Sequence, residues 1–409
     1  MDDGPATDKA RVLPLPPAPD GIELRHLRAF VAVAEELNFG RAASRLYLSQ
    51  PALSRQIRSL ERHVGCDLLR RSTHGVELTV AGDALLERAR DLLHGVDDAV
   101  SATRAVGGEI AGRLARIWEP VSELATADTD LQELRNATET LHAQFAPPPE
   151  TTVQPVNTGG VPSLLVTADA ARDATLLFLH GGGYVSGSAF GYRHMAGALA
   201  VAADCGVVVP EYRLAPEHPF PAAIEDALRA YVWMLDSGIR PDDVTLAGDS
   251  SGGGLALSLL IRLTQEGLPL PGGAVLLSPG VDLTFEQLDD LADDPQPALS
   301  LDQMRSFAAS YLAGHPADDP LVSPLLADLT GLPPLLVQGG TGDFVVVDAH
   351  RLAARAREHG VDVRLELYPA DTHDFQVFWS FLPEAADALK QAGRFAREVA
   401  SPEAHRASS

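Results

Sequence analysis

The sequence predicts two parts of different fold class, an all-α domain near the N-terminus and a larger α/β part with a mostly parallel, doubly wound sheet. In the first part, apolar residues recur three and four positions apart, which is typical of amphipathic helices. In the larger part, short apolar runs alternate with amphipathic stretches, as in a parallel sheet that helices cover on both faces. A length of 409 residues also exceeds one ordinary core, so two or three units are expected.

The charges are distributed unevenly along the chain. The formal net charge of −24 would by itself argue against nucleic-acid binding, because an acidic surface repels phosphate. Residues 22–82, however, carry nine arginines against six carboxylates. The acidic surplus therefore belongs to the larger part, where it solvates the surface, and the basic segment needs a separate explanation.

Residues 1–21 are expected to form a disordered tail and not a signal peptide, because they are rich in Asp and Pro and contain no apolar run. The two cysteines, Cys66 and Cys205, lie too far apart in sequence to indicate a disulfide framework or a metal site. No segment has the roughly 20 consecutive apolar residues that span a bilayer. We therefore expect a cytoplasmic protein without membrane contact.

The N-terminal part is expected to hold three short helices and a two-stranded hairpin. Helical spacing of apolar residues covers residues 24–37 and 39–46. Ser49 can cap a third helix, with Pro51 tolerated in its first turn. One face of this third helix is polar and basic, with Ser54, Arg55, Arg58 and Arg62. Residues 68–78 then indicate a hairpin, or wing.

A long helix follows the hairpin. Thr79 can cap this helix, and its apolar stripe is long enough to need a partner surface. Gly107, Gly108 and Gly112 are expected to mark its end. Further helical sequence then leads from residue 113 to the Pro-rich break APPPE.

Six buried strands are expected in the larger part. They cover residues 175–179, 207–210, 244–247, 274–277, 335–338 and 363–367. Because active sites of open α/β sheets lie at the carboxyl ends of the strands, the loops that follow these runs are the first place to look for chemistry.

Ser250 is the candidate nucleophile. It lies in GDSSGG, directly after the predicted strand at 244–247 and before a helical run. Flanking glycines allow a strand to turn sharply into a helix and leave the serine exposed on the turn.

The segment HGGGY, residues 180–184, also follows a predicted strand. Consecutive glycines can aim backbone N–H groups at one point, where an acyl-transfer enzyme must stabilise negative charge on a carbonyl oxygen. We assign this oxyanion hole to the N–H groups of Gly181, Gly182 and Ser251.

A serine hydroxyl needs a base and an orienting carboxylate. His373 follows the predicted strand at 363–367, and Asp343 follows the strand at 335–338. The order Ser, Asp, His is the one that the α/β-hydrolase fold requires. Asp348 is the main alternative for the acid, while Asp371 and Asp374 flank the histidine.

These motifs, together with YRLAPEHPFPAA at 212–223, resemble the bacterial hormone-sensitive-lipase family of carboxylesterases over residues 113–400. The resemblance implies a cofactor-free serine esterase with no metal, a preference for short acyl chains, and a helical cap. Two positions depart from the family pattern. Ser251 replaces the usual Ala, which keeps the backbone donor, and HDF replaces HGF, which puts the carboxylate of Asp374 beside the base and can raise its pKa.

The segment LRHLRAFVAVAEELNFGRAASRLYLSQPALSRQIRSLERHVGCDLLRRS resembles the winged helix-turn-helix of LysR-type transcription regulators, and the helix after TVAG resembles their dimerising linker. The resemblance implies double-stranded DNA as a partner and a homodimer. The third helix would enter the major groove. The contacts would be Gln50, Ser54 and Arg55 at base edges, and Arg41, Arg58 and Arg71 at phosphates.

The effector domain of such regulators is missing, and a hydrolase takes its place. Three interpretations stay open: an esterase with a DNA-binding appendage, a regulator that senses a ligand with its hydrolase fold, or a fusion whose N-terminal part is idle. We favour the esterase, because a sensor has no need of a complete triad. The expected segments are a tail (1–21), a winged helix-turn-helix domain (22–82), a linker helix (83–112), a cap (113–154, with 284–313 as a possible addition) and a catalytic domain (155–401).

Overall fold

A computed structural model of the chain describes residues 21–46, 48–72, 75–124, 130–169, 171, 174–288 and 300–400. The tail predicted for residues 1–21 lies outside these ranges, except for Gly21. The chain divides into two compact units, residues 1–109 and 110–409, and the boundary falls inside one helix. Among the described residues, none of the helices combines the length and the apolar character that a membrane span requires.

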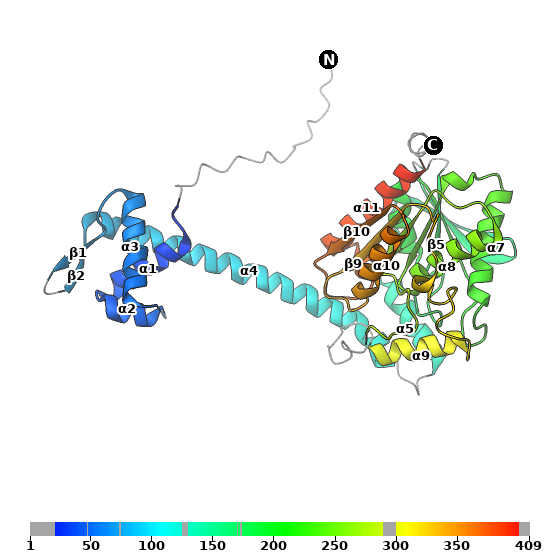
Figure 1. Cartoon of the computed structure of the whole chain (residues 1–409), viewed down its shortest axis with the longest axis horizontal. Helices are drawn as coiled ribbons and strands as arrows, with labels where there is room; N and C mark the ends of the chain where they lie inside the picture. The colour runs from blue at the N-terminus through cyan, green and yellow to red at the C-terminus, as the bar shows by residue number, and fades with distance from the viewer. Residues whose placement is uncertain are drawn as a thin grey trace, which may run out of the picture. The chain divides into compact units, whose positions relative to one another are not determined.

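The N-terminal unit contains the expected three helices and hairpin (Figure 1). Its elements are α1 (Leu24–Glu36), α2 (Phe39–Arg45), α3 (Gln50–Val64), β1 (Leu69–Ser72) and β2 (Gly75–Leu78). Ser49 caps α3 by accepting from the Ala52 N–H, as its side-chain type predicts. A small core around the fully buried Phe30, Leu53 and Ile57 holds the three helices together.

The long helix α4 (Val80–Leu124) differs from the prediction, which ended it at residue 112. Glycine in a helix interior costs only about 1 kcal/mol relative to alanine, so three glycines do not by themselves end a helix. Beyond them the helix buries Leu114, Trp118 and Val121 in the core of the second unit, and this burial stabilises the extra turns. The sequence interval assigned to a separate cap therefore begins inside α4.

The second unit is built on an eight-stranded sheet with the order β10-β9-β8-β7-β5-β6-β4-β3. The strands are β3 (Thr151–Thr158), β4 (Val161–Ala168), β5 (Thr175–Leu179), β6 (Gly206–Pro210), β7 (Val244–Asp249), β8 (Gly273–Leu277), β9 (Leu335–Gly340) and β10 (Val363–Tyr368). The six predicted strands correspond to β5 to β10, all parallel, which confirms the α/β fold class.

The antiparallel strands β3 and β4 were not predicted, and β3 takes up residues 151–154 of the expected cap. Their sequences, TTVQPVNT and VPSLLVTA, contain proline, which removes a ladder donor and argues against a central strand. Pro155 is tolerated because β3 lies at the edge of the sheet.

Helices cover both faces of the sheet (Figure 1). On one face lie α6 (Arg193–Ala203) and α11 (Pro383–Val399), and on the other α7 (Ala222–Asp236), α8 (Ser251–Glu266) and α10 (Val346–Glu358). Helices α5 (Leu131–Ala143) and α9 (Leu301–Leu312) complete the unit, with short 3₁₀ turns at Pro241–Asp243, Pro324–Leu326 and Phe375–Phe378.

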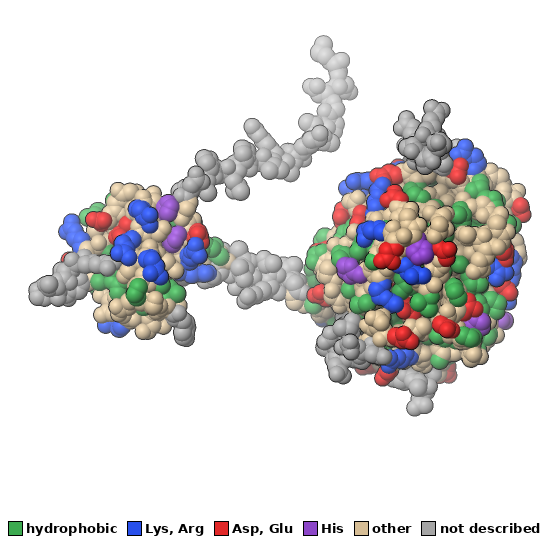
Figure 2. Space-filling model, in the orientation of Figure 1, with side chains coloured by type: hydrophobic (Ala, Val, Ile, Leu, Met, Phe, Trp, Pro, Cys, Tyr) green, Lys and Arg blue, Asp and Glu red, His purple; other side chains and the backbone are tan. Residues whose placement is uncertain are grey.

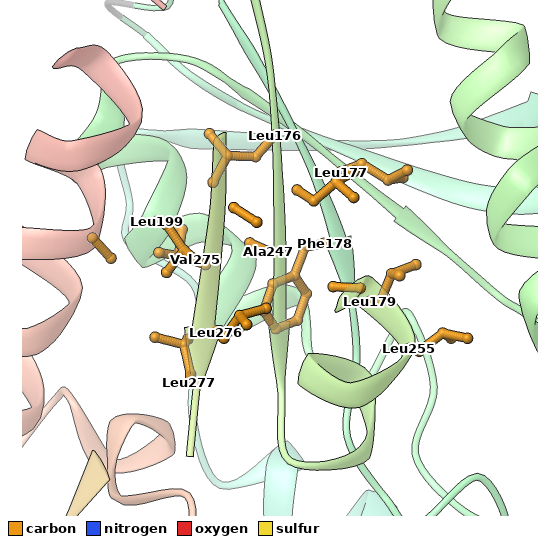
Figure 3. Packing of buried hydrophobic residues seen from close by; sticks show 14 of the residues in the cluster. Leu176, Leu177, Phe178, Leu179, Leu199, Ala247, Leu255, Val275, Leu276 and Leu277 are labelled. Carbon is orange, nitrogen blue, oxygen red and sulfur yellow. The ribbon is translucent and has the colours of Figure 1, made fainter. Parts of the chain in front are cut away.

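The centre of the sheet is buried on both sides, as Figure 3 shows. Successive side chains of β5, Leu176, Leu177 and Phe178, point to opposite faces, and each is almost inaccessible to solvent. This burial explains why the strand is an unbroken apolar run and not an alternating one. It also makes the sheet a rigid base for the loops at its carboxyl edge.

Candidate active site

Ser250 lies on a sharp turn between β7 and α8. Its backbone has φ 50° and ψ −121°, which is an unfavourable conformation for a residue with a Cβ. The turn is held from both sides, because the Ser250 N–H donates to the Leu277 carbonyl (2.9 Å) and the Gly280 N–H donates to the Ser250 carbonyl (3.0 Å). The surrounding structure therefore fixes the direction in which the hydroxyl points.

The glycines around Ser250 are required by close approach of the backbone. A Cβ on Gly252 would lie 2.0 Å from the Leu179 carbonyl oxygen, and a Cβ on Gly248 would lie 2.2 Å from the carbonyl oxygen of Gly252. Both distances are far below van der Waals contact. The two glycines thus allow α8 to begin directly beside the end of β5.

The structure brings the three predicted triad side chains together. Ser250 Oγ lies 2.8 Å from His373 Nε2, and His373 Nδ1 lies 2.8 Å from Asp343 Oδ2. His373 and Asp343 are both buried, on the loops that follow β10 and β9. The arrangement gives the hydroxyl a base within hydrogen-bond distance and gives that base an orienting carboxylate.

The alternative acids lie elsewhere. Asp348 Oδ2 accepts the Val281 N–H at 3.0 Å, and its other oxygen faces Arg351. Asp371 is exposed. Asp374 is buried, and its Oδ2 lies 3.3 Å from His373 Nε2, the same nitrogen that faces Ser250. The base is therefore placed between two carboxylates, one at each ring nitrogen.

This second carboxylate changes the electrostatics of the base. Burial alone would lower the pKa of His373, but the charges of Asp374 and Asp343 outweigh it and raise the pKa to about 10. Asp249, at the end of β7, acts in the same direction. Burial in turn raises the pKa of Asp374 to about 7, because its charged form is poorly solvated there.

The glycine loop after β5 corrects one expectation. The N–H of Gly181 donates to Asp249 Oδ1 at 2.8 Å, so it already has an acceptor and is not a free donor for an oxyanion. Gly182, Gly183 and Ser251 instead line the pocket beside Ser250. The sequence could not distinguish Gly181 from Gly183, because the difference depends on where the loop meets Asp249.

No partner for the N–H of Gly182 or Gly183 is found among the described residues. Both have positive φ, 114° and 63°, and a Cβ on Gly183 would lie 2.6 Å from the Phe307 ring. Only glycine fits this close approach of the loop to the pocket wall.

The pocket above Ser250 is concave and mostly apolar, with walls from three helices outside the sheet. Its apolar lining is Trp118 and Val121 of α4, Leu134 and Leu141 of α5, and Phe285, Met304 and Phe307 in and before α9. Trp118 Nε1 donates to Thr372 Oγ1 (2.9 Å), next to His373. The sequence predicted a cap here but did not identify its lining residues, because helical periodicity shows which face is apolar and not what that face covers.

The predicted DNA-contacting residues lie on the N-terminal unit. Figure 2 shows basic side chains gathered on the face that carries α3, where Arg25, Arg55, Arg58 and Arg62 line a shallow groove. Arg55 and Arg58 are exposed and form no ion pair with another described residue, Ser54 lies half-buried beside them, and Gln50 begins the helix.

The other two predicted phosphate contacts, Arg41 and Arg71, are not shown as free, exposed guanidinium groups as Arg58 is. The Arg41 guanidinium is already bonded to Glu36, with Nε 3.0 Å from Oε2. Arg71 belongs to β1, but its side chain lies outside the described part of the structure.

Within the described ranges no group of three or more His, Cys, Asp or Glu is arranged to hold a metal ion.

Comparison with known proteins gives a separate match for each of the two units. Residues 176–377 match the family model described as alpha/beta hydrolase fold, and residues 24–83 match the model described as bacterial regulatory helix-turn-helix protein, lysR family. The α/β part is thus similar to hydrolases, and the N-terminal part to a DNA-binding domain.

Whole proteins that are similar to this chain match part of its length. An acetyl-hydrolase of Streptomyces hygroscopicus is 44% identical over 56% of this chain and 79% of its own length. An esterase of Acinetobacter venetianus is 35% identical over 65% of this chain and 88% of its own length. The crystal structure of an esterase from the bacterial hormone-sensitive lipase family has a TM-score of 0.65 and 39% identity, covering 70% of this chain and 98% of that one.

Replacement of Asp374 by asparagine is expected to lower the pKa of His373 by about one pH unit or more, because a negative charge beside Nε2 disappears. Asparagine keeps the size of the side chain and accepts the positive φ of 48° at this position. The measurement is the titration of the His373 imidazole by ¹³C NMR, with its resonance assigned by its loss in His373→Gln.

Asp371→Asn is the matched control, because it removes an exposed carboxylate two residues before His373. We expect the pKa of His373 to change little in this variant. An unchanged pKa in Asp374→Asn, or an equal shift in both variants, would show that Asp374 does not act on the base.

Proposed function

Because the chain belongs to the bacterial hormone-sensitive lipase family of α/β hydrolases, we propose that it is a serine carboxylesterase that hydrolyses small, short-chain carboxylic esters. The observation that carries this proposal is the hydrogen-bonded series from Ser250 through His373 to Asp343. Ser250 and His373 lie at a mostly apolar pocket, and α4, α5 and α9 supply side chains to its walls.

In the proposed mechanism, His373 Nε2 takes the proton of Ser250 as Oγ attacks the ester carbonyl carbon. The negative charge that develops on the carbonyl oxygen is stabilised by the backbone N–H groups of Gly182, Gly183 and Ser251. Ser251 is the first residue of α8, so its N–H has no acceptor within the helix, and the helix N-terminus adds a favourable potential.

The second half of the reaction uses the same groups. His373 gives its proton to the alkoxide as it departs, and the acyl group stays bonded to Ser250 Oγ. A water molecule, deprotonated by His373, then attacks the acyl carbon. The bond to Ser250 Oγ breaks, His373 returns the proton to that oxygen, and the carboxylic acid is released. Asp343 accepts the Nδ1–H throughout and keeps the Nε2 lone pair directed at the reacting oxygen. No cofactor enters these steps.

The N-terminal unit supports a second, separate proposal, that residues 22–82 bind double-stranded DNA through α3. The supporting observations are the match to the LysR-family model and the exposed arginines of α3. Positive side chains that are free of carboxylate partners can neutralise phosphates and release counterions. Formation of a homodimer through α4 stays a prediction.

The alternative for the whole chain is a DNA-binding regulator whose hydrolase pocket senses a small ligand. Both functions share the same α3 contacts, so DNA binding does not separate them. Turnover that depends on Ser250 does, because a sensor needs binding but not a nucleophile.

Ser250→Ala is expected to lower kcat/KM for p-nitrophenyl acetate and butyrate by at least about 10³-fold, because the nucleophile of the triad is lost. The full-length protein is assayed before and after the substitution. Ser258→Ala, which removes a buried hydroxyl from the same helix α8, serves as the control and is expected to keep its activity. Equal activity in Ser250→Ala and the unmodified protein would rule out the proposed nucleophile.

Arg58→Ala is expected to weaken binding of a duplex DNA fragment, because one phosphate contact is lost. The slope of log affinity against log salt should become shallower by roughly one. Fluorescence anisotropy of labelled duplex DNA at several salt concentrations measures both quantities. Arg240→Ala, which removes the same charge from the catalytic unit, should change neither. No binding at low salt by the unmodified protein would contradict the DNA proposal.

A further inference from the structure

A chain of three rings, the half-buried Trp379 and the buried His194 and His142, extends from the His373 loop to the pocket wall. Trp379 Nε1 donates to His194 Nδ1 at 3.3 Å, and His194 Nε2 lies 3.2 Å from His142 Nδ1. Trp379 follows the 3₁₀ turn Phe375–Phe378, His194 belongs to α6 and His142 to α5. Neither histidine has a role in the proposed proton transfers.

The hydrogen-bonding capacities of these rings determine where each proton sits. An indole N–H only donates, so His194 Nδ1 must accept. A neutral imidazole has one donor and one acceptor, so His194 carries its proton on Nε2 and donates it to His142. His142 Nδ1 is then an acceptor, and the His142 proton must be on Nε2.

Both histidines are held in the neutral form on which this reasoning depends. Burial lowers the pKa of His194 to about 3, and burial also lowers the pKa of His142 well below its usual value, with the nearby His194, His180 and Arg193 adding to the effect. Near neutral pH neither ring is doubly protonated. The Trp379 N–H donor therefore fixes the tautomer of His194, and His194 in turn fixes the tautomer of His142.

His142 Nε2 is the free end of this chain. His142 lines the same pocket as Ser250 and His373, and Nε2 has no hydrogen-bond partner among the described residues. The Tyr192 ring packs against the imidazole, with ring centroids 4.1 Å apart, and restricts its rotation. A hydrogen-bond donor is thus held in the wall of a mostly apolar pocket, away from the triad groups in the proposed proton transfers.

We propose that His142 determines substrate specificity by donating its Nε2–H to an oxygen acceptor of the ester substrate. The class of substrate is a small ester with a second oxygen, as an ether, keto or hydroxyl group, beyond the scissile ester group. An alkyl chain at the same place would leave the buried N–H without a partner, which disfavours it. The inference rests on the proposed esterase function and adds a chemical preference to it.

The test compares two matched pairs of esters that differ by one oxygen in place of a methylene. p-Nitrophenyl methoxyacetate and butyrate probe the acyl side, and 2-methoxyethyl acetate and butyl acetate probe the alcohol side. His142→Phe keeps an aromatic ring but removes the donor. We expect the ratio of kcat/KM values, oxygen-bearing over alkyl, to fall by roughly 3- to 10-fold in one pair.

Trp379→Phe tests the role of the chain without touching His142. Without the indole N–H, His194 can take either tautomer, so His142 no longer presents its donor all the time. We expect a smaller fall in the same ratio, and ¹⁵N NMR should show the His142 ring changing from a single Nε2–H tautomer to a mixture. Trp233→Phe, the same substitution on α7, is the control and should change neither.

The outcomes separate this inference from the esterase proposal. Hydrolysis with unchanged ratios in both pairs for His142→Phe, or a His142 protonated on Nδ1 in the unmodified protein, would overturn the role of His142 and leave the esterase intact. If His142→Phe does not fold, Trp379→Phe and the tautomer measurement still decide. Absence of any hydrolysis by the unmodified protein would contradict the esterase function itself.

Discussion

The turn at Ser250 is the constraint on which the other parts of the catalytic unit depend. It joins the central strand β7 to α8 through Ser250 alone, and this is possible only because Gly248 and Gly252 let backbone groups approach each other closely. The same approach brings the start of α8 against the end of β5, where the glycine loop begins. Nucleophile, helix N-terminus and backbone donors are therefore placed by one packing arrangement. The unfavourable φ of Ser250 is held by hydrogen bonds with Leu277, at the end of β8, and with Gly280 in the loop that follows.

The base of the triad has a second carboxylate beside it, that of Asp374. Residue 374 also has a positive φ, in the left-handed region that Gly, Asn and Asp adopt, and it carries an aspartate whose side chain is buried against His373. A carboxylate at Nε2 favours the protonated imidazole before the serine has lost its proton, and this opposes the first step of catalysis. Its effect on the base is partly limited by its own burial, which favours the neutral acid. The site thus combines a complete triad with a second carboxylate, that of Asp374, which shifts the pH range in which the His373 imidazole is unprotonated.

The sequence allowed the fold class and the order of the triad to be predicted, because buried parallel strands are unbroken apolar runs and each triad residue lies in the turn or loop that follows one. It did not reveal β3 and β4, whose prolines and half-exposed residues resemble a loop, or the continuation of α4 past its glycines. Those features depend on contacts with distant segments. The acceptor of the Gly181 N–H and the His142 chain depend on single hydrogen bonds between elements, and no local pattern encodes such bonds.

The most direct measurement of the central claim, that Ser250 is an activated nucleophile, is covalent labelling of the full chain with diethyl p-nitrophenyl phosphate followed by mass spectrometry. A serine beside a base attacks this reagent and keeps the diethyl phosphoryl group, because the adduct mimics the acyl intermediate without its rapid hydrolysis. We expect one group per chain, on Ser250, and none in His373→Ala over the same time. A label on Ser251 instead, or an unlabelled chain that remains folded, would contradict the assignment.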